Sequence, residues 1–307
     1  MTAKQITDNH GPQVYTYCVA DFRLRIVLDT ANDGNSIGLL PSFVPFLADS
    51  AAESLPLLFT LTVSDAFDTG ELIEEIGCFD TGNGDIIVHR TACGGYRYLI
   101  KNLSGEVCCM LVSSSDFSQC QCMLFGDKAM RSIGLNNALM MMFAFASCPH
   151  DTLLIHASCV VADGKAYPFI AKSGTGKSTH SSLWLKNIAN THLLNDDNPI
   201  VRIVNGTVMI YGSPWSGKTP CYRQEKFPAG AIVKICRAPA NSIERLSTIH
   251  AFAAILPSCS TMKTDERLHG MLCQTIGKVI SGISVYNMYC LPDNEAALIC
   301  HSQVSPN

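Results

Sequence analysis

The chain has 307 residues, of which 47% are apolar and 16% are charged, and its formal net charge is −4. This length exceeds that of most single domains, and the apolar share favours filled cores over disorder. The negative charge provides no basic field, so we expect neither nucleic acid nor a membrane as a partner.

The 15 cysteines include no Cys-x-x-Cys spacing, which excludes the usual zinc and thioredoxin-like motifs. The first residues, MTAKQITDNHGPQ, lack an apolar signal core, and unpatterned thiols are typical of a reducing compartment. We therefore expect a cytoplasmic protein. The most apolar run, ALMMMFAFA at 138–146, is too short to cross a bilayer and predicts a buried helix.

The pattern of strands and helices divides the chain into three parts. Residues 1–125 contain short strands joined by turns, beginning with a stretch at 13–29, and predict a mainly antiparallel β domain. Residues 126–150 predict a connecting helix, with the domain boundary in it or directly after it. Residues 151–307 alternate strands and helices and predict an α/β domain.

Two hairpins are expected in this last part. Asp163-Gly164 separates the apolar runs 153–161 and 166–171, and Asn205-Gly206 divides the stretch 200–212. Asp-Gly and Asn-Gly favour tight hairpin turns because these residues adopt positive backbone angles readily. A parallel phosphate-binding domain has helices at such positions, so the hairpins predict a mixed sheet instead.

The second arm of the first hairpin leads into AKSGTGKST at 171–179. This stretch matches the pattern G-x-x-x-x-G-K-[ST] except at its first position, where Ala171 replaces glycine. Alanine is acceptable at this position if its backbone angle φ is negative. Gly174 and Gly176 let backbone N–H groups approach phosphate oxygens, Lys177 supplies positive charge, and Ser178 supplies a hydroxyl to Mg²⁺. We expect ATP and Mg²⁺ to bind here, with contacts from Ser173, Gly174, Thr175, Gly176, Lys177, Ser178 and Thr179.

An acid pair follows nineteen residues after Lys177, as Asp196-Asp197. That distance allows one helix and a return strand, which would bring the acids to the edge of the sheet beside the loop. One carboxylate can hold Mg²⁺, and the other can accept a proton from an attacking hydroxyl. His156, in the middle of the first expected strand, is predicted to lie close to the pair.

A third unusual stretch reads GSPWSGKT at 212–219. One interpretation is a loop over the active site, in which Ser216 or Lys218 touches substrate or phosphate. The other is a surface loop anchored by a buried Trp215. The pattern leaves both interpretations open.

Taken in order, LIHA at 154–157, the hairpin, SGTGKS at 173–178 and the acid pair resemble the catalytic domain of HPr serine kinase/phosphorylase. The same order occurs in ATP-dependent phosphoenolpyruvate carboxykinases, which share that P-loop fold. The resemblance covers roughly residues 150–300 and implies an α/β domain with a mixed sheet and a P-loop.

By position, the resemblance implies that Lys177 and Ser178 bind phosphate and Mg²⁺. It further implies that Asp196 is the general base, that Asp197 is a metal-linked acid, and that His156 is their neighbour. The family's Arg-Gly-Leu-Gly segment after the acids is replaced here by GSPWSGKT, so the resemblance does not identify HPr as the substrate.

The expected activity is an ATP-dependent kinase that phosphorylates a hydroxyl on a protein, a peptide or a small molecule. The chain also resembles the short HPr-kinase-like proteins found with peptide-modification systems. Two alternatives stay open: a carboxykinase-like enzyme acting on a small carboxylic acid, and a nucleotide-binding regulator without catalysis. The sequence also leaves open whether the chain forms a homo-oligomer.

Overall fold

The computed structural model describes residues 11–80, 84–217 and 219–305. Two features of the sequence therefore lie outside the described residues. One is most of the N-terminal stretch MTAKQITDNHGPQ, which is expected to lack a signal peptide. The other is Lys218 of the stretch GSPWSGKT. The chain forms two compact units. Unit 1 contains the chain up to Cys18, Phe22–Pro41 and Leu47–Met142, and unit 2 contains Val19–Asp21, Ser42–Phe46 and Phe143–Asn307.

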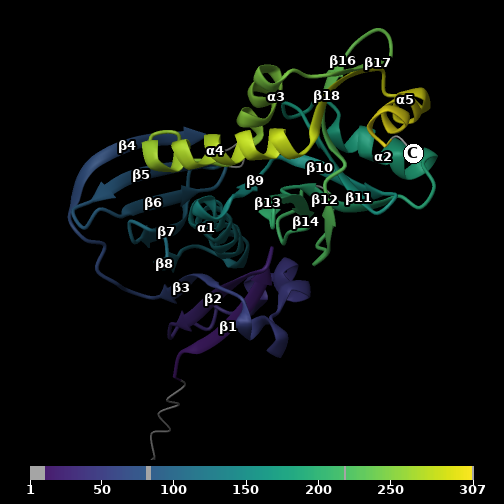
Figure 1. Cartoon of the computed structure of the whole chain (residues 1–307). Helices are drawn as coiled ribbons and strands as arrows, with labels where there is room; N and C mark the ends of the chain where they lie inside the picture. The colour runs from purple at the N-terminus through teal and green to yellow at the C-terminus, as the bar shows by residue number, and fades with distance from the viewer. Residues whose placement is uncertain (1–10, 81–83, 218, 306–307) are drawn as a thin grey trace, which may run out of the picture. The chain divides into compact units, whose positions relative to one another are not determined.

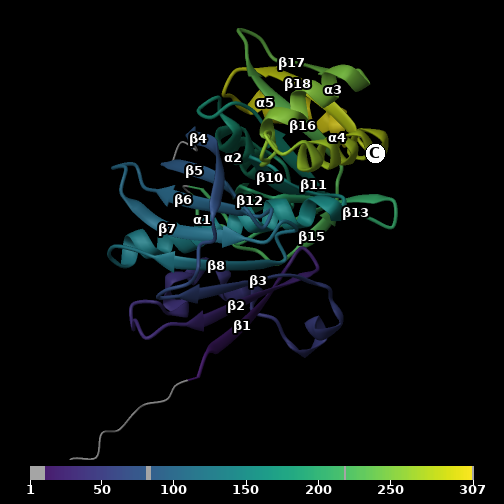
Figure 2. The same ribbon diagram turned by 90° about the vertical axis from the view of Figure 1, so that its left-hand side faces the viewer.

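The first part of the chain forms one eight-stranded sheet, in the order β1-β2-β3-β8-β7-β6-β5-β4 (Figure 2). Its strands are β1 (Gln13–Val19), β2 (Phe22–Asp29), β3 (Leu57–Ser64), β4 (Leu72–Asp80), β5 (Asp85–Thr91), β6 (Tyr96–Lys101), β7 (Val107–Ser113) and β8 (Gln119–Leu124). Strands β4 to β8 pair antiparallel, but β3 is parallel to both β2 and β8. Most of these pairings are antiparallel, as the sequence predicts, although the expectation did not include the parallel pairings of β3.

The parallel pairing of β2 and β3 requires a crossover, since a tight turn can join only antiparallel strands. The crossover carries three short 3₁₀ helices, η1 (Ile37–Leu39), η2 (Pro41–Phe46) and η3 (Ser50–Ser54). Helix α1 (Lys128–Ser147) follows β8 and contains the apolar run expected to be helical. The long C-terminal segment of unit 2 begins within this helix, at Phe143.

Unit 2 contains a six-stranded mixed sheet in the order β12-β10-β11-β16-β18-β17 and a four-stranded sheet in the order β15-β14-β13-β9. The first sheet comprises β10 (Ala157–Ala162), β11 (Lys165–Ile170), β12 (His192–Asp197), β16 (Ala231–Arg237), β17 (Ser242–Arg245) and β18 (Ser284–Cys290). The second comprises β9 (Thr152–Leu154), β13 (Ile200–Val204), β14 (Thr207–Tyr211) and β15 (Lys226–Pro228). The mixed sheet is as expected, but the second hairpin belongs to the separate antiparallel sheet.

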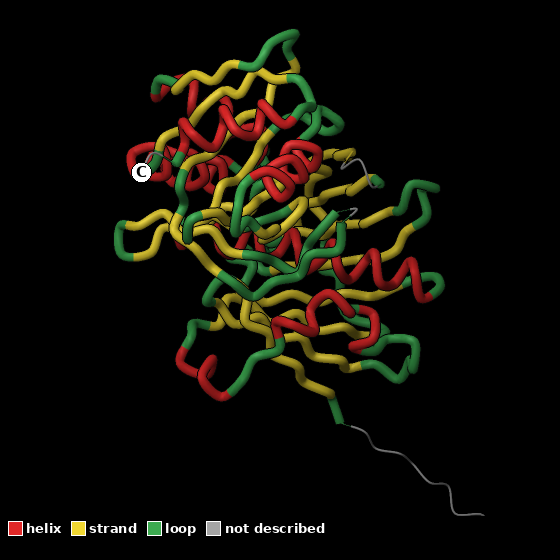
Figure 3. The backbone as a smooth tube through the Cα atoms, turned by 90° about the vertical axis from the view of Figure 1, so that its right-hand side faces the viewer, coloured by secondary structure: helices red, strands yellow, loops and turns green. Residues whose placement is uncertain are grey.

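Helices of unit 2 contact both of its sheets. Helices are drawn as red tubes in Figure 3. Those of unit 2 are α2 (Lys177–Asn187), α3 (Thr248–Ile255), α4 (Glu266–Gly282) and α5 (Asn294–Val304), with short 3₁₀ segments η4 (Cys148–His150) and η5 (Leu256–Ser258). Helices α2 and α5 pack side by side (Figure 1). Within the described residues, no helix combines the length and apolar character needed to cross a bilayer.

The core between the mixed sheet and helices α2 and α5 is centred on Trp184, which is fully buried. Its ring centroid lies 5.2 Å from that of Tyr167 and 5.3 Å from that of Phe169. The indole N–H donates to His180 Nε2 at 3.2 Å, which requires an unprotonated imidazole nitrogen. Burial lowers the pKa of His180 to about 4.

The low pKa of His180 predicts a loss of stability in acid. The ring takes up a proton near pH 6.5 in the unfolded chain but stays neutral there in the folded chain. The stabilisation that the neutral ring provides is therefore fully present above that pH. It is lost as the pH falls from about 6.5 towards about 4, by about 3 kcal/mol in all. Replacing His180 with glutamine keeps an acceptor for the indole and should flatten this decline. Denaturant unfolding of both proteins across this pH range measures the difference, and parallel curves would contradict the prediction.

Candidate functional site

Three segments meet at one edge of the mixed sheet. Strands β11 and β12 each pair antiparallel with β10, so both run in the same direction. In the register, Ala157 at the start of β10 lies opposite Ile170 at the end of β11 and Asp197 at the end of β12. The topology therefore brings together the loop after β11, the acid pair, and the residues that precede β10.

The loop between β11 and α2 contains Gly174 with φ 75° and Gly176 with φ 125°. A Cβ atom added to either glycine would meet no atom within 4 Å, so the backbone angle requires glycine and the space beside the loop is open. The expected helix begins at Lys177, directly after the loop. Ser173 and Thr179 are exposed on either side of this turn. The arrangement directs the positive end of α2 into the open space.

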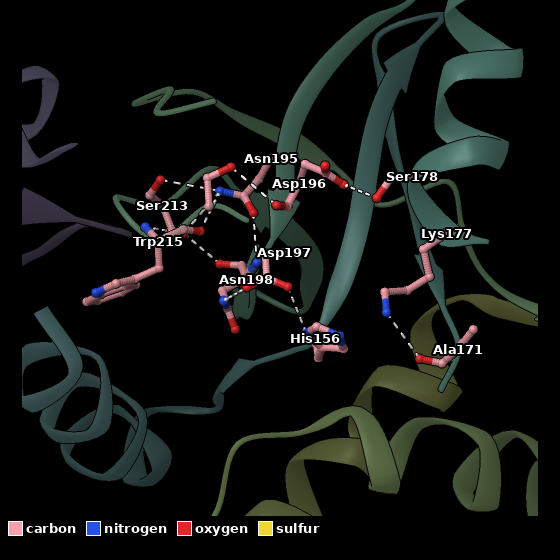
Figure 4. Close-up of polar contacts among 11 residues, drawn as sticks. His156, Ala171, Lys177, Ser178, Asn195, Asp196, Asp197, Asn198, Ser213 and Trp215 are labelled. Atoms are coloured by element: carbon pink, nitrogen blue, oxygen red, sulfur yellow. Dashed lines mark hydrogen bonds and ion pairs between the residues drawn. The ribbon is translucent and has the colours of Figure 1, made fainter. Parts of the chain in front are cut away.

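The Lys177 ammonium lies half-buried at the base of the loop, 3.3 Å from the carbonyl oxygen of Ala171, to which it donates (Figure 4). Desolvation lowers the pKa of Lys177, while the attraction of Asp197 and Asp196 acts in the opposite direction. A cation that has lost part of its hydration and makes one neutral contact is well suited to bind an incoming anion.

Asp196 is buried, with 6% of its surface exposed, and its Oδ1 accepts a hydrogen bond from Ser178 Oγ at 2.9 Å (Figure 4). Ser178 lies in the first turn of α2 and Asp196 at the end of β12, as the spacing predicts. The acid pair therefore does lie beside the loop.

Asp197 makes a different contact, because its Oδ1 lies 2.9 Å from His156 Nδ1 (Figure 4). Both side chains are partly open to solvent, at 42% for His156 and 31% for Asp197. The sequence predicts His156 in the middle of a strand, and the structure differs. His156 lies between β9 and β10, where the chain passes from one sheet to the other, and this break turns its ring towards the acid.

The backbone of Asp197 has φ 153°, in a region that residues other than glycine rarely adopt. Such angles typically cost about 1–3 kcal/mol and persist only where surrounding contacts hold them. Strained residues cluster at functional sites, which supports the choice of Asp197 as a site residue.

The stretch 212–219 crosses the end of β12, where Ser216 forms an isolated bridge with Asp197. Ser216 Oγ lies 3.2 Å from the backbone oxygen of Asp196 and 2.7 Å from that of Thr219, and its single hydroxyl hydrogen can be donated to either, so the backbone already provides acceptors for this hydroxyl. Trp215 is 2% exposed, and its ring packs against Phe43 and Phe143 at centroid distances of 5.7 and 5.3 Å. Trp215 is therefore a buried anchor and does not present its ring to a substrate.

The sequence interpretation missed two groups at this edge. Arg237, at the end of β16, donates from Nε to the carbonyl oxygen of Thr175 at 3.0 Å and from Nη2 to that of Gly174 at 2.5 Å. No motif marks this arginine, because only the parallel pairing of β11 with β16 brings it to the loop. The other group is the buried Asn195 with its partner Ser213. The signal that could have identified it is a polar residue, Asn195, directly before the acid pair at the end of an apolar strand.

Among the described residues, no group of three or more His, Cys, Asp or Glu side chains could hold a metal ion. The oxygens of Ser178 and Asp196, which share a hydrogen bond, are nevertheless hard donors of the kind that Mg²⁺ prefers. Mg²⁺ in nucleotide sites takes only one or two protein ligands and completes its shell with phosphate oxygens and water. This pair of residues therefore fits a nucleotide-bound Mg²⁺ and not a metal held by protein alone.

Comparison with solved structures gives a distant likeness. No protein-family model and no curated protein matches the sequence. The solved structure of the Hpr(Ser) kinase/phosphatase from Coxiella burnetii is similar to this chain at 12% sequence identity and a TM-score of 0.29. The match covers 49% of this chain and 93% of that one.

Proposed function

We propose that this chain binds ATP with Mg²⁺ and transfers the γ-phosphoryl group to a hydroxyl group. The observation that carries the proposal is the meeting, at one sheet edge, of a glycine loop with Lys177 and two differently partnered carboxylates. A loop and helix end of this kind bind phosphates, and a carboxylate within reach of an acceptor hydroxyl can take its proton.

The contacts favour a division of roles opposite to the one expected from the sequence. Ser178 directs its hydroxyl hydrogen at Asp196, which leaves the oxygen lone pairs free for a cation, so these two residues would hold Mg²⁺. When bound, Mg²⁺ neutralises charge on the phosphate oxygens. Asp197 would be the general base, because His156 holds its carboxylate in place from the other side.

In the proposed reaction, the acceptor oxygen forms a bond to the γ-phosphorus while the bond to the β–γ bridging oxygen breaks and ADP leaves. The proton of the acceptor hydroxyl passes to the Asp197 carboxylate. Lys177 and the N–H groups of the loop hold the phosphate oxygens in line for this transfer. The acceptor is a hydroxyl of a peptide, a protein or a small molecule.

Transfer from labelled ATP to serine peptides, proteins and free hydroxy compounds tests the proposal. The expected result is label on a hydroxyl acceptor that depends on Mg²⁺ and disappears in a variant with both Asp196 and Asp197 replaced by asparagine. Transfer that requires a keto acid would favour a carboxykinase-like enzyme. Tight ATP binding without transfer to any acceptor would favour a regulator.

Arg237 provides a second test at the same loop. Its guanidinium fixes the carbonyls of Gly174 and Thr175, so replacing it with glutamine should weaken ATP binding by roughly tenfold. Arg237→Lys should recover only part of this loss, because an ammonium cannot make both hydrogen bonds in the same plane. The matched control is Arg245→Gln, which removes the same charge from exposed β17. Calorimetry measures all four affinities, and equal losses in both glutamine variants would reject a specific role for Arg237.

A further inference from the structure

Asn195 links the acid pair to the 212–219 loop from a fully buried position, with 0% exposure. Its carboxamide nitrogen donates to Ser213 Oγ at 3.2 Å and to the carbonyl oxygen of Trp215 at 3.1 Å. Its carboxamide oxygen accepts the backbone N–H of Asn198 at 2.8 Å. One side chain therefore ties together the residue after the acid pair and the loop that crosses it.

Ser213 completes this connection. Its hydroxyl donates to the carbonyl oxygen of Asn198 at 2.6 Å and accepts the backbone N–H of Trp215 at 3.2 Å. Both backbone groups of Asn198 are thus fixed by buried side chains. On the other side of Asp197, the carbonyl oxygen of Asp196 accepts the N–H of Gly217 at 2.6 Å.

The peptides on both sides of Asp197 are therefore held, and Asp197 itself has the strained φ of 153°. A strained angle relaxes when the contacts that impose it are removed. Relaxation here would turn the carboxylate, which lies 2.9 Å from His156 Nδ1 and 2.8 Å from Asn198 Nδ2.

We infer that Asn195 and Ser213 are positioning residues, which impose the backbone of Asp197 and thereby aim its carboxylate at His156. Neither residue is expected to touch a substrate. The consequence for phosphoryl transfer rests on the proposed function, but the effect on the contact between Asp197 and His156 does not.

The test uses ¹⁵N-histidine spectra of the full chain without nucleotide, recorded at a pH where the His156 ring is neutral. The signal is identified by its loss in His156→Gln. In the wild type, a carboxylate facing Nδ1 should favour the tautomer with hydrogen on Nδ1. Asn195→Ala and Ser213→Ala should shift the population towards the Nε2–H tautomer. Where phosphoryl transfer is measured, kcat should fall about 10- to 100-fold while ATP affinity changes less than about threefold.

Thr275→Val is the control, since it removes a buried hydroxyl that bonds to Met271 within α4. It should leave the His156 spectrum unchanged. Ser213→Ala decides the matter alone if Asn195→Ala does not fold. A wild-type His156 spectrum in folded Ser213→Ala would overturn the inference, and an unchanged kcat would overturn its part in transfer. A shifted tautomer in a protein that transfers no phosphate would keep the positioning role and reject the proposed function.

Discussion

Replacing Lys177 with alanine is expected to weaken ATP binding by about 100-fold or more, or about 2.7 kcal/mol. The wild-type ammonium is partly desolvated, and burial lowers its pKa. Among the described residues, it donates a hydrogen bond to the carbonyl oxygen of Ala171. Triphosphate oxygens offer this cation a charged partner in place of that neutral one, so removing the ammonium should eliminate a large part of the binding energy.

Lys186 provides the matched control, because it is an exposed lysine in the last turn of the same helix. Calorimetric titration of wild type, Lys177→Ala and Lys186→Ala with ATP and Mg²⁺ separates a local contact from a general loss of positive charge. Equal ATP affinity in all three proteins would mean that the loop is not a phosphate site.

The parts of the fold that the sequence predicted well are those with strong local chemistry. Asp163 and Gly164 have φ of 50° and 71°, and Asn205 and Gly206 have φ of 50° and 80°, so both expected hairpin turns form. The helix that the spacing between the loop and the acid pair allows is present and begins at Lys177. In each case the conformational freedom of a few residues determines the local structure, independently of distant contacts.

In the stretch 13–29, local sequence does not predict the structure that forms. This stretch forms two strands, separated by Ala20 and Asp21 with φ of 49° and 60°. Alanine gives no turn signal, and contacts from Arg202 to the Ala20 carbonyl and from Tyr211 and Lys226 to the Asp21 carboxylate hold this turn. These partners lie far along the chain, so no local sequence pattern could predict the contacts.

The site shows the same limit. The loop and the acid pair followed from spacing, but the division of roles between the two acids did not, because adjacent carboxylates have the same sequence signature. Ser178 and His156 distinguish the acids by direct contact, and only the register of β10 against its two neighbours places those partners.

The separate roles of the two acids lead to the second large prediction. Asp197→Asn should lower the rate of phosphoryl transfer by about 10²–10⁴ while leaving ATP affinity nearly unchanged, because it removes the general base. Asparagine tolerates positive φ about as well as aspartate, and its amide oxygen can still accept from His156. The fold and the position of the ring should therefore persist, and the loss should appear in kcat.

Asp196→Asn should behave differently. An amide oxygen is a poorer ligand for a hard cation than a carboxylate, so this variant should need more Mg²⁺ to reach its maximal rate. Hydroxyl phosphorylation measured against Mg²⁺ concentration for wild type and both variants separates the two effects. Exchanged phenotypes would return the base to Asp196 and the metal role to Asp197. Unchanged transfer in both variants would exclude the acids from the mechanism, and the contacts of Ser178 and His156 would then be structural only.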